Sequence, residues 1–91
     1  FDAIQSMINA NDALTIYFLG KRASRDHREA VKLHIDVVRV INDSTCRNIL
    51  KQALDARSTV GYLGTPVSKG DAERLIINAI KFLGWVKKHV K

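Results

Sequence analysis

The chain has 91 residues, 46% of them hydrophobic and 26% charged, and a formal net charge of +6 at neutral pH. This length allows a single domain, residues 1–91, and the composition excludes a disordered chain. No apolar run approaches the ~18 residues of a membrane-crossing helix, so we expect no membrane partner. The single cysteine, Cys46, excludes an internal disulfide and favours a reducing, cytoplasmic location. The positive charge favours anionic partners.

The first predicted helix spans Phe1 to Leu19, where apolar residues recur at three- and four-residue steps. Its polar residues fall on one narrow stripe, which comprises Asp2, Gln5, Asn9 and Asp12. A helix that is apolar on most of its circumference is typical of one packed on several sides. Gly20 is placed to end this helix in the left-handed conformation.

A second helix is predicted after Ser24, which is a plausible N-cap, and it ends before Asn42. Its apolar face has the helical period and comprises Ala30, Val31, His34, Val37, Val38 and Ile41. The Val/Ile content also permits a strand, but the charges do not alternate at period two, which favours a helix.

A third helix is predicted over residues 45–58, and the glycines and proline of residues 59–70 predict a loop. Ser68 is the expected N-cap of a fourth helix that runs to about Val90 and ends in a cluster of lysines. Four helices with short connections predict an all-α, up-and-down helical bundle.

The densest positive charge lies in and after the turn between the first two helices, at Lys21, Arg22, Arg25, His27 and Arg28. Cations beside the free N–H groups of a helix start favour phosphate binding, so Lys21, Arg22, Arg25 and Arg28 are candidate anion- or nucleotide-binding residues. A solvated basic corner is the alternative. No aromatic residue interleaves these charges, so base stacking is not indicated.

Arg22 and His27 suggest a second chemistry, as candidate catalytic residues. A histidine can take a proton from a ribose 2′-hydroxyl while an arginine stabilises the phosphate, which cleaves RNA without a metal. Arg28 and His34 have similar spacing, but His34 falls near the apolar face, which favours a packed core histidine. His89, near the C-terminus, is expected to cap a helix or to lie in solvent.

Motifs for a metal or a cofactor are not found in the sequence. There is no His-Glu-x-x-His, no cysteine pair, no Gly-x-Gly-x-x-Gly and no phosphate loop. We therefore predict neither a metal site nor a cofactor. Trp85 and Tyr62 are expected to be core or interface anchors.

Several segments resemble the HEPN (higher eukaryotes and prokaryotes nucleotide-binding) domain family. The similarity is most specific over Phe1–Ile4, Asn9–Leu14, Leu19–Ser24 and Asp26–Val31, and it continues more loosely through Ala56–Tyr62, Val67–Ser68 and Phe82–Val86. The resemblance implies a helical bundle, commonly a homodimer, with one further helix before Phe1, which would account for a start without Met.

The resemblance implies one of two activities. Some family members are metal-independent ribonucleases with Arg and His four to six residues apart, many of them toxins paired with a nucleotidyltransferase antitoxin. Arg22 and His27 fit that spacing, but Ala23 replaces the usual polar residue, and the family motif usually lies later in the bundle. We therefore expect a non-catalytic module that binds nucleotide or RNA phosphates, alone or beside a nucleotidyltransferase. The alternatives are a ribonuclease toxin using Arg22 and His27, and a structural dimerisation module.

Overall fold

The computed structural model describes residues 2–23, 27–63 and 69–90, and for His27 and residues 56–63 it describes the backbone alone. Within these ranges there are four helices and no strand: α1 (Ala3–Leu19), α2 (His27–Ile41), α3 (Arg47–Leu63) and α4 (Lys69–His89). The prediction of an all-α bundle of four helices is therefore confirmed, including the choice of helix over strand for α2. Over the part of the chain described, no helix has both the length and the apolar character needed to cross a membrane.

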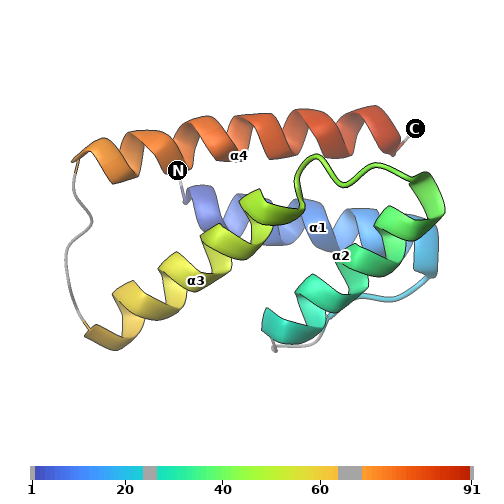
Figure 1. Ribbon diagram of the computed structural model, residues 1–91, viewed down its shortest axis with the longest axis horizontal. Helices are drawn as coiled ribbons and strands as arrows, with labels where there is room; N and C mark the ends of the chain where they lie inside the picture. The colour runs from blue at the N-terminus through green and yellow to red at the C-terminus, as the bar shows by residue number, and fades with distance from the viewer. Residues whose placement is uncertain (1, 24–26, 64–68, 91) are drawn as a thin grey trace.

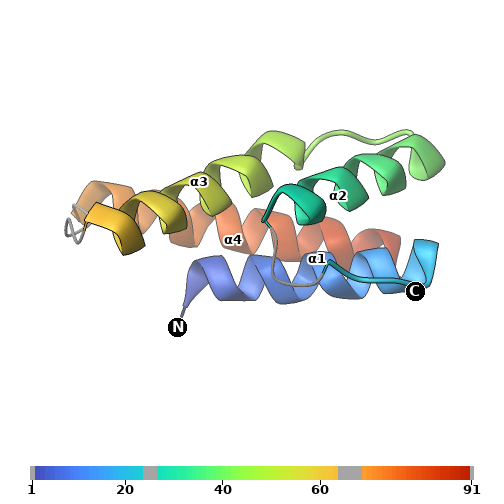
Figure 2. The same cartoon turned by 90° about the horizontal axis from the view of Figure 1, so that it is seen from below.

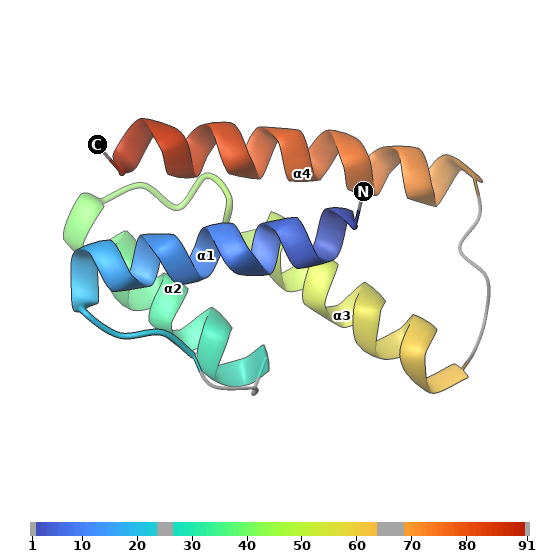
Figure 3. The ribbon, with the colours of Figure 1, turned by 180° about the vertical axis from the view of Figure 1, so that it is seen from behind.

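The helices form two layers, with α2 and α3 lying across the pair formed by α1 and α4 (Figure 2). α1 and α4 lie side by side and run in the same direction, while α3 runs back against them (Figures 1 and 3). α1 contacts each of the other three helices. The expectation that the first helix packs on several sides is confirmed.

The core lies where α1 meets the other three helices, and its largest fully buried apolar side chains are Met7, Leu14, Val37, Leu50 and Phe82. Smaller residues fill the space between them, notably Ala30, Ala53 and Ala79. Removing these side chains from water supplies the main force that holds the helices together. The apolar periodicity of the sequence therefore identified the faces that the fold buries.

Both ends of α1 have recognisable caps. Asp2 is the N-cap, and its Oδ1 accepts a hydrogen bond from the backbone N–H of Gln5 at 3.0 Å. Gly20 adopts φ 72°, and its N–H donates to the carbonyl of Ile16 at 2.9 Å. The predicted glycine stop is confirmed, whereas the predicted start at Phe1 lies outside the described residues.

α2 ends at a residue with positive φ, as α1 does. Asn42 has φ 55°, and its N–H donates to the carbonyl of Val38 at 2.7 Å. Asparagine tolerates this conformation better than most residues. The predicted end of the helix is confirmed, while Ser24 and Ser68, the two expected N-caps, lie outside the described residues.

The predicted end of α3 is wrong. The expected helix stopped at Ser58, with a loop over 59–70, but α3 continues to Leu63 and α4 begins at Lys69. A glycine inside a helix, here Gly61, costs only about 1 kcal/mol relative to alanine, so it weakens a helix without ending it. The connection is therefore shorter than its glycines suggest.

Candidate functional site

The described basic residues of the predicted turn lie on the surface. Lys21 and Arg22 follow the glycine stop of α1 and are exposed, and Arg28 is exposed in the first turn of α2. Ala23 is buried, so it fixes this stretch against the core while its basic neighbours face water. Arg25 lies outside the described residues, as does the side chain of His27, whose backbone begins α2.

Arg22 lies close enough to the polar stripe of α1 to act on Asp12. Partial burial raises the pKa of the Asp12 carboxyl, and the positive charge of Arg22 counteracts that rise. An anion that binds Arg22 therefore competes with the Asp12 carboxylate of this protein. This makes Arg22 a weaker phosphate ligand than its exposure alone suggests.

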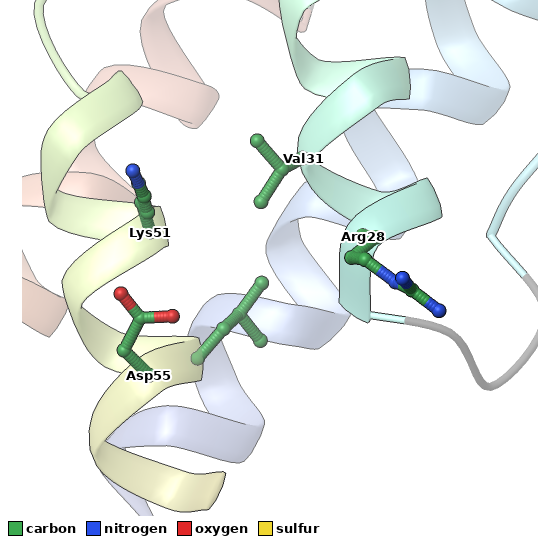
Figure 4. A pocket seen from close by; sticks show the side chains of 5 residues that line it. Arg28, Val31, Lys51 and Asp55 are labelled. Carbon is green, nitrogen blue, oxygen red and sulfur yellow. The ribbon is translucent and has the colours of Figure 1, made fainter.

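Arg28 also lines a cleft between α2 and α3, which has a volume of about 210 Å³. Arg28 and Val31 come from α2, and Lys51, Leu54 and Asp55 come from α3. Figure 4 shows the Lys51 and Asp55 side chains on one wall and Val31 on the facing wall, while the Arg28 side chain starts at the rim and its guanidinium is directed away from the α3 wall. The cleft joins an apolar lining to two cations and one carboxylate.

This combination suits a ligand with both a flat apolar part and an anionic part. Val31 and Leu54 offer contact to an apolar or aromatic group, Lys51 offers charge-assisted hydrogen bonds to phosphate oxygens, and Arg28 adds positive charge at the rim. Asp55 adds an acceptor for a ribose hydroxyl or a base amino group. A mononucleotide or the end of an RNA strand has all three features.

His34 belongs to the core. It is fully buried, and its Nδ1 lies 2.9 Å from Oδ1 of Asn11, which is also buried. Asn11 Nδ2 donates to the carbonyl of Ala30 at 3.4 Å, so Oδ1 is the acceptor and His34 carries its proton on Nδ1. The expectation of a packed core histidine is confirmed, and Arg28 and His34 form no joint surface site.

Burial, with the nearby positive charge of Arg47, lowers the pKa of His34 to about 4. Its Nε2 is buried and has no hydrogen-bond partner within the described part of the chain. Phe82 and Trp85 lie against the ring, with centroid distances of 5.9 and 5.4 Å. His34 is therefore a neutral imidazole at physiological pH.

Asn11 was missed at the sequence level. It stands four residues after Met7 and three before Leu14, both of which are fully buried, so it occupies a position of the apolar face. That spacing was the signal that could have identified it, because a polar residue at a core position needs a buried partner.

A second polar cluster, which we call the Asp43 cluster, joins the α2–α3 turn to α4. Asp43 Oδ2 accepts from the indole N–H of Trp85 at 2.9 Å and lies 2.9 Å from His89 Nε2. Asp43 Oδ1 accepts from the backbone N–H of Thr45 at 3.1 Å and from the Thr45 hydroxyl. These hydrogen bonds, first that of the Thr45 hydroxyl, lower the pKa of Asp43. His89 is thus half-buried and bound to a side chain, not the capping or exposed residue that was expected.

Among the described residues, no group of three or more His, Cys, Asp or Glu side chains could hold a metal ion. Cys46 is fully buried, and burial raises the pKa of its thiol. A buried thiol of this kind is a packing residue rather than a nucleophile. The exposed cations and the α2–α3 cleft therefore form the candidate site.

Comparisons with protein-family models, with curated proteins and with solved structures found no match for this chain.

Proposed function

We propose that this chain is a HEPN-like module that binds the phosphates of a nucleotide or of RNA in the α2–α3 cleft, without catalysing a reaction. The observation that supports it best is that Arg28 and Lys51 line one cleft together with Val31 and Leu54. The resemblance of the first thirty residues to the HEPN family supports the same ligand class. A nucleotidyltransferase partner belongs to this proposal as well.

Arg28→Ala and Lys51→Ala test the cleft. Loss of a charge-assisted hydrogen bond costs about 1.5–3 kcal/mol, so we expect each variant to weaken nucleotide binding about tenfold or more. Isothermal titration calorimetry with mononucleotides and a short single-stranded RNA measures this. Binding should also weaken as salt is raised, because the contacts are between charges.

Two further variants locate the site. Lys32→Ala removes an exposed cation of α2 that does not line the cleft, so it should leave binding unchanged. Asp55→Asn removes the negative charge of the cleft and should tighten binding of inorganic phosphate. If Lys32→Ala weakens binding as much as Arg28→Ala, the ligand recognises overall charge and the cleft proposal is wrong. If no nucleotide or RNA binds at all, the function itself is wrong.

The second candidate function is a metal-independent ribonuclease that uses Arg22 and His27. Arg22 is exposed, and α2 begins at His27, five residues later in the chain. Cleavage of RNA should then persist in EDTA and be lost in His27→Ala, as measured by gel electrophoresis of a labelled RNA. Cleavage that is unchanged in His27→Ala would belong to another residue or to a contaminant.

A further inference from the structure

One face of α4 stays exposed along most of the helix, which lies along one edge of the molecule (Figures 1 and 3). Three isoleucines on this face are exposed: Ile76 by 43%, Ile77 by 64% and Ile80 by 63%. Single exposed apolar residues are ordinary on a protein surface, but three neighbouring isoleucines on one helix indicate a contact surface.

The exposed residues of α4 fall into rows that repeat every seven residues, which is the period of helices that pair side by side. Two adjacent rows form the centre of the face, and they comprise Gly70, Ile77 and Gly84, and Glu73, Ile80 and Lys87. We call these two rows the α4 seam. The seam is apolar in its middle, at Ile77 and Ile80, and charged at Glu73 and Lys87 on either side.

One flank of the α4 seam is uniformly positive. Arg74, Lys81 and Lys88 are exposed, are again spaced by seven residues, and each directly follows a residue of the second seam row. None of the three forms an ion pair with another described residue. The opposite flank has no such charge pattern and comprises Lys69, Ile76 and Leu83. In paired helices, the charges of the flanking rows select the partner and its direction.

This flank disfavours a second copy of α4 in either direction. Antiparallel helices would set the three cations of one copy against those of the other. Parallel helices would set them against Lys69, Ile76 and Leu83, none of which is acidic. Like charges across an interface oppose association, so the seam selects a partner with a different charge pattern.

A uniformly anionic surface also fits poorly. The Glu73 carboxylate lies in the seam itself, where a membrane of anionic lipids or an RNA backbone would repel it. RNA would in addition leave the aliphatic side chains of Ile77 and Ile80 without an apolar partner. A helix with acidic residues along one flank covers the isoleucines, pairs with the three cations and can place a cation opposite Glu73.

We propose that the α4 seam binds an amphipathic α-helix of another protein, with apolar residues over Ile77 and Ile80 and a row of acidic residues beside Arg74, Lys81 and Lys88. No residue that lines the α2–α3 cleft belongs to α4. The interaction is therefore separate from nucleotide binding.

A designed peptide tests the chemistry of the partner. The probe is a helix of about three heptads with leucine in its two seam rows and glutamate in both flanking rows, and the matched control has lysine in place of glutamate. The glutamate peptide should bind and gain helix content, because the cations of α4 offset the repulsion between its own glutamates. The lysine peptide should not bind. Fluorescence anisotropy measures the affinity, and circular dichroism measures the helix content.

Charge reversal on α4 tests the positive flank. Arg74→Glu with Lys81→Glu should weaken binding of the glutamate peptide and create binding of the lysine peptide, because the facing charges are then of opposite sign. A variant that had lost its fold would gain no new partner. Lys32→Glu with Arg39→Glu, at exposed positions of α2, changes the net charge equally. It should leave the affinity within about twofold at physiological salt, where distant surface charges are screened.

Ile77→Asn tests the apolar middle of the seam. Burial of one isoleucine is large enough to change a dissociation constant about tenfold or more, so this variant should bind the glutamate peptide correspondingly less tightly. Val40, on α2, is exposed by 62%, close to the 64% of Ile77. Val40→Asn is therefore the matched control and should bind as the natural chain does.

The proposal is overturned if the glutamate and lysine peptides bind equally, or if neither binds at hundreds of micromolar. It is overturned equally if the double variant on α2 weakens binding as much as the one on α4, since the chain then recognises net charge. Vesicles that contain phosphatidylserine and a short RNA are the remaining probes. If either binds the chain and loses that binding in Ile77→Asn, the α4 seam recognises a membrane or a nucleic acid, and the proposal is wrong.

Discussion

At the scale of single residues, the buried Asn11–His34 pair makes the stability of the fold depend on pH. The imidazole can remain in the core only while its Nε2 is unprotonated, because that atom is buried and has no partner in the described part of the chain. A proton there would place a charge against Phe82 and Trp85. The neutral form is therefore a condition of the fold.

The pair predicts how stability varies with pH. The pKa of His34 falls from 6.5 in the unfolded chain to about 4 in the fold, so the unfolded state binds the proton first as the pH falls. Stability from this residue is fully present above pH 6.5 and is lost as the pH falls toward 4. We expect a loss of about 2 kcal/mol between pH 7 and pH 5, measured by urea unfolding at each pH.

A double variant serves as the control. Asn11→Leu with His34→Phe replaces both polar partners by apolar side chains, which can be close to neutral when the shape is kept. Its unfolding free energy should vary much less between pH 7 and pH 5 than that of the natural chain. An equal pH dependence in both proteins would assign the effect to other groups.

At the scale of the helices, the end of α1 depends on one residue that has no side chain. Gly20 has φ 72°, and a Cβ built there meets nothing within 4 Å. Gly20→Ala should therefore lower the free energy of unfolding by about 1–2 kcal/mol, and the whole loss comes from the left-handed backbone conformation. Thermal or urea unfolding measures this loss.

Gly70→Ala is the matched control for Gly20→Ala. A Cβ built at Gly70 also meets nothing within 4 Å, but Gly70 lies inside α4 and its φ is not positive. Alanine favours a helix more than glycine does, so this change should be neutral or stabilising. Equal losses in the two variants would contradict the role assigned to the backbone at Gly20.

The Asp43 cluster shows how a short turn is fixed between two helices. Asp43 follows the positive-φ residue that ends α2, and its carboxylate binds both the next turn, at Thr45, and α4, at Trp85 and His89. One side chain thus holds the α2–α3 turn against the C-terminal part of α4. No local signal marks Asp43 for this role, because its partners Trp85 and His89 lie more than forty residues later in the chain.

Local signals predicted the helices and three of their ends. Periodicity placed α1 to α4, Gly20 and Asn42 marked stops, and Lys87 and Lys88 marked the last turn of α4. The signal failed at Gly61, where glycines near one another suggested a loop and the helix continued. The position of a helix end depends on several small free-energy contributions from neighbouring residues, and a single glycine is not enough to end a helix.

At the scale of the whole molecule, the sequence predicted only the part of the candidate site that lies on α2. Arg28 was identified from the run of positive charge, but Lys51 and Asp55 carry no local mark that sets them apart from other exposed charges. They join Arg28 because α3 packs beside α2, and that contact depends on tertiary structure. The run of positive charge thus marks the α2 wall of the cleft, and no local pattern marks the α3 wall.

The directions of the helices differ from the up-and-down order that the short connections predicted, because α1 and α4 run in the same direction (Figures 1 and 3). Short connections favour antiparallel neighbours, but residues 20–26 are enough to span about 23 Å at about 3.3 Å per residue. α2 begins beside the middle of α1, not at its end (Figure 1). α3 then runs back against α1, and α4 follows it in the direction of α1, so that α1 and α4 lie parallel (Figure 1).

The parallel pair of α1 and α4 also sets an order for folding. These helices are neighbours in space, but all of α2 and α3 separates them along the chain. Closing a loop of about fifty residues costs on the order of 3 kcal/mol in chain entropy before any contact offsets it. Contacts of α1 with α2, and of α2 with α3, close much shorter loops. When these contacts form first, less flexible chain remains between α1 and α4. We therefore expect the first and last helices to meet late, and the folding rate to be limited by topology more than by the speed of helix formation.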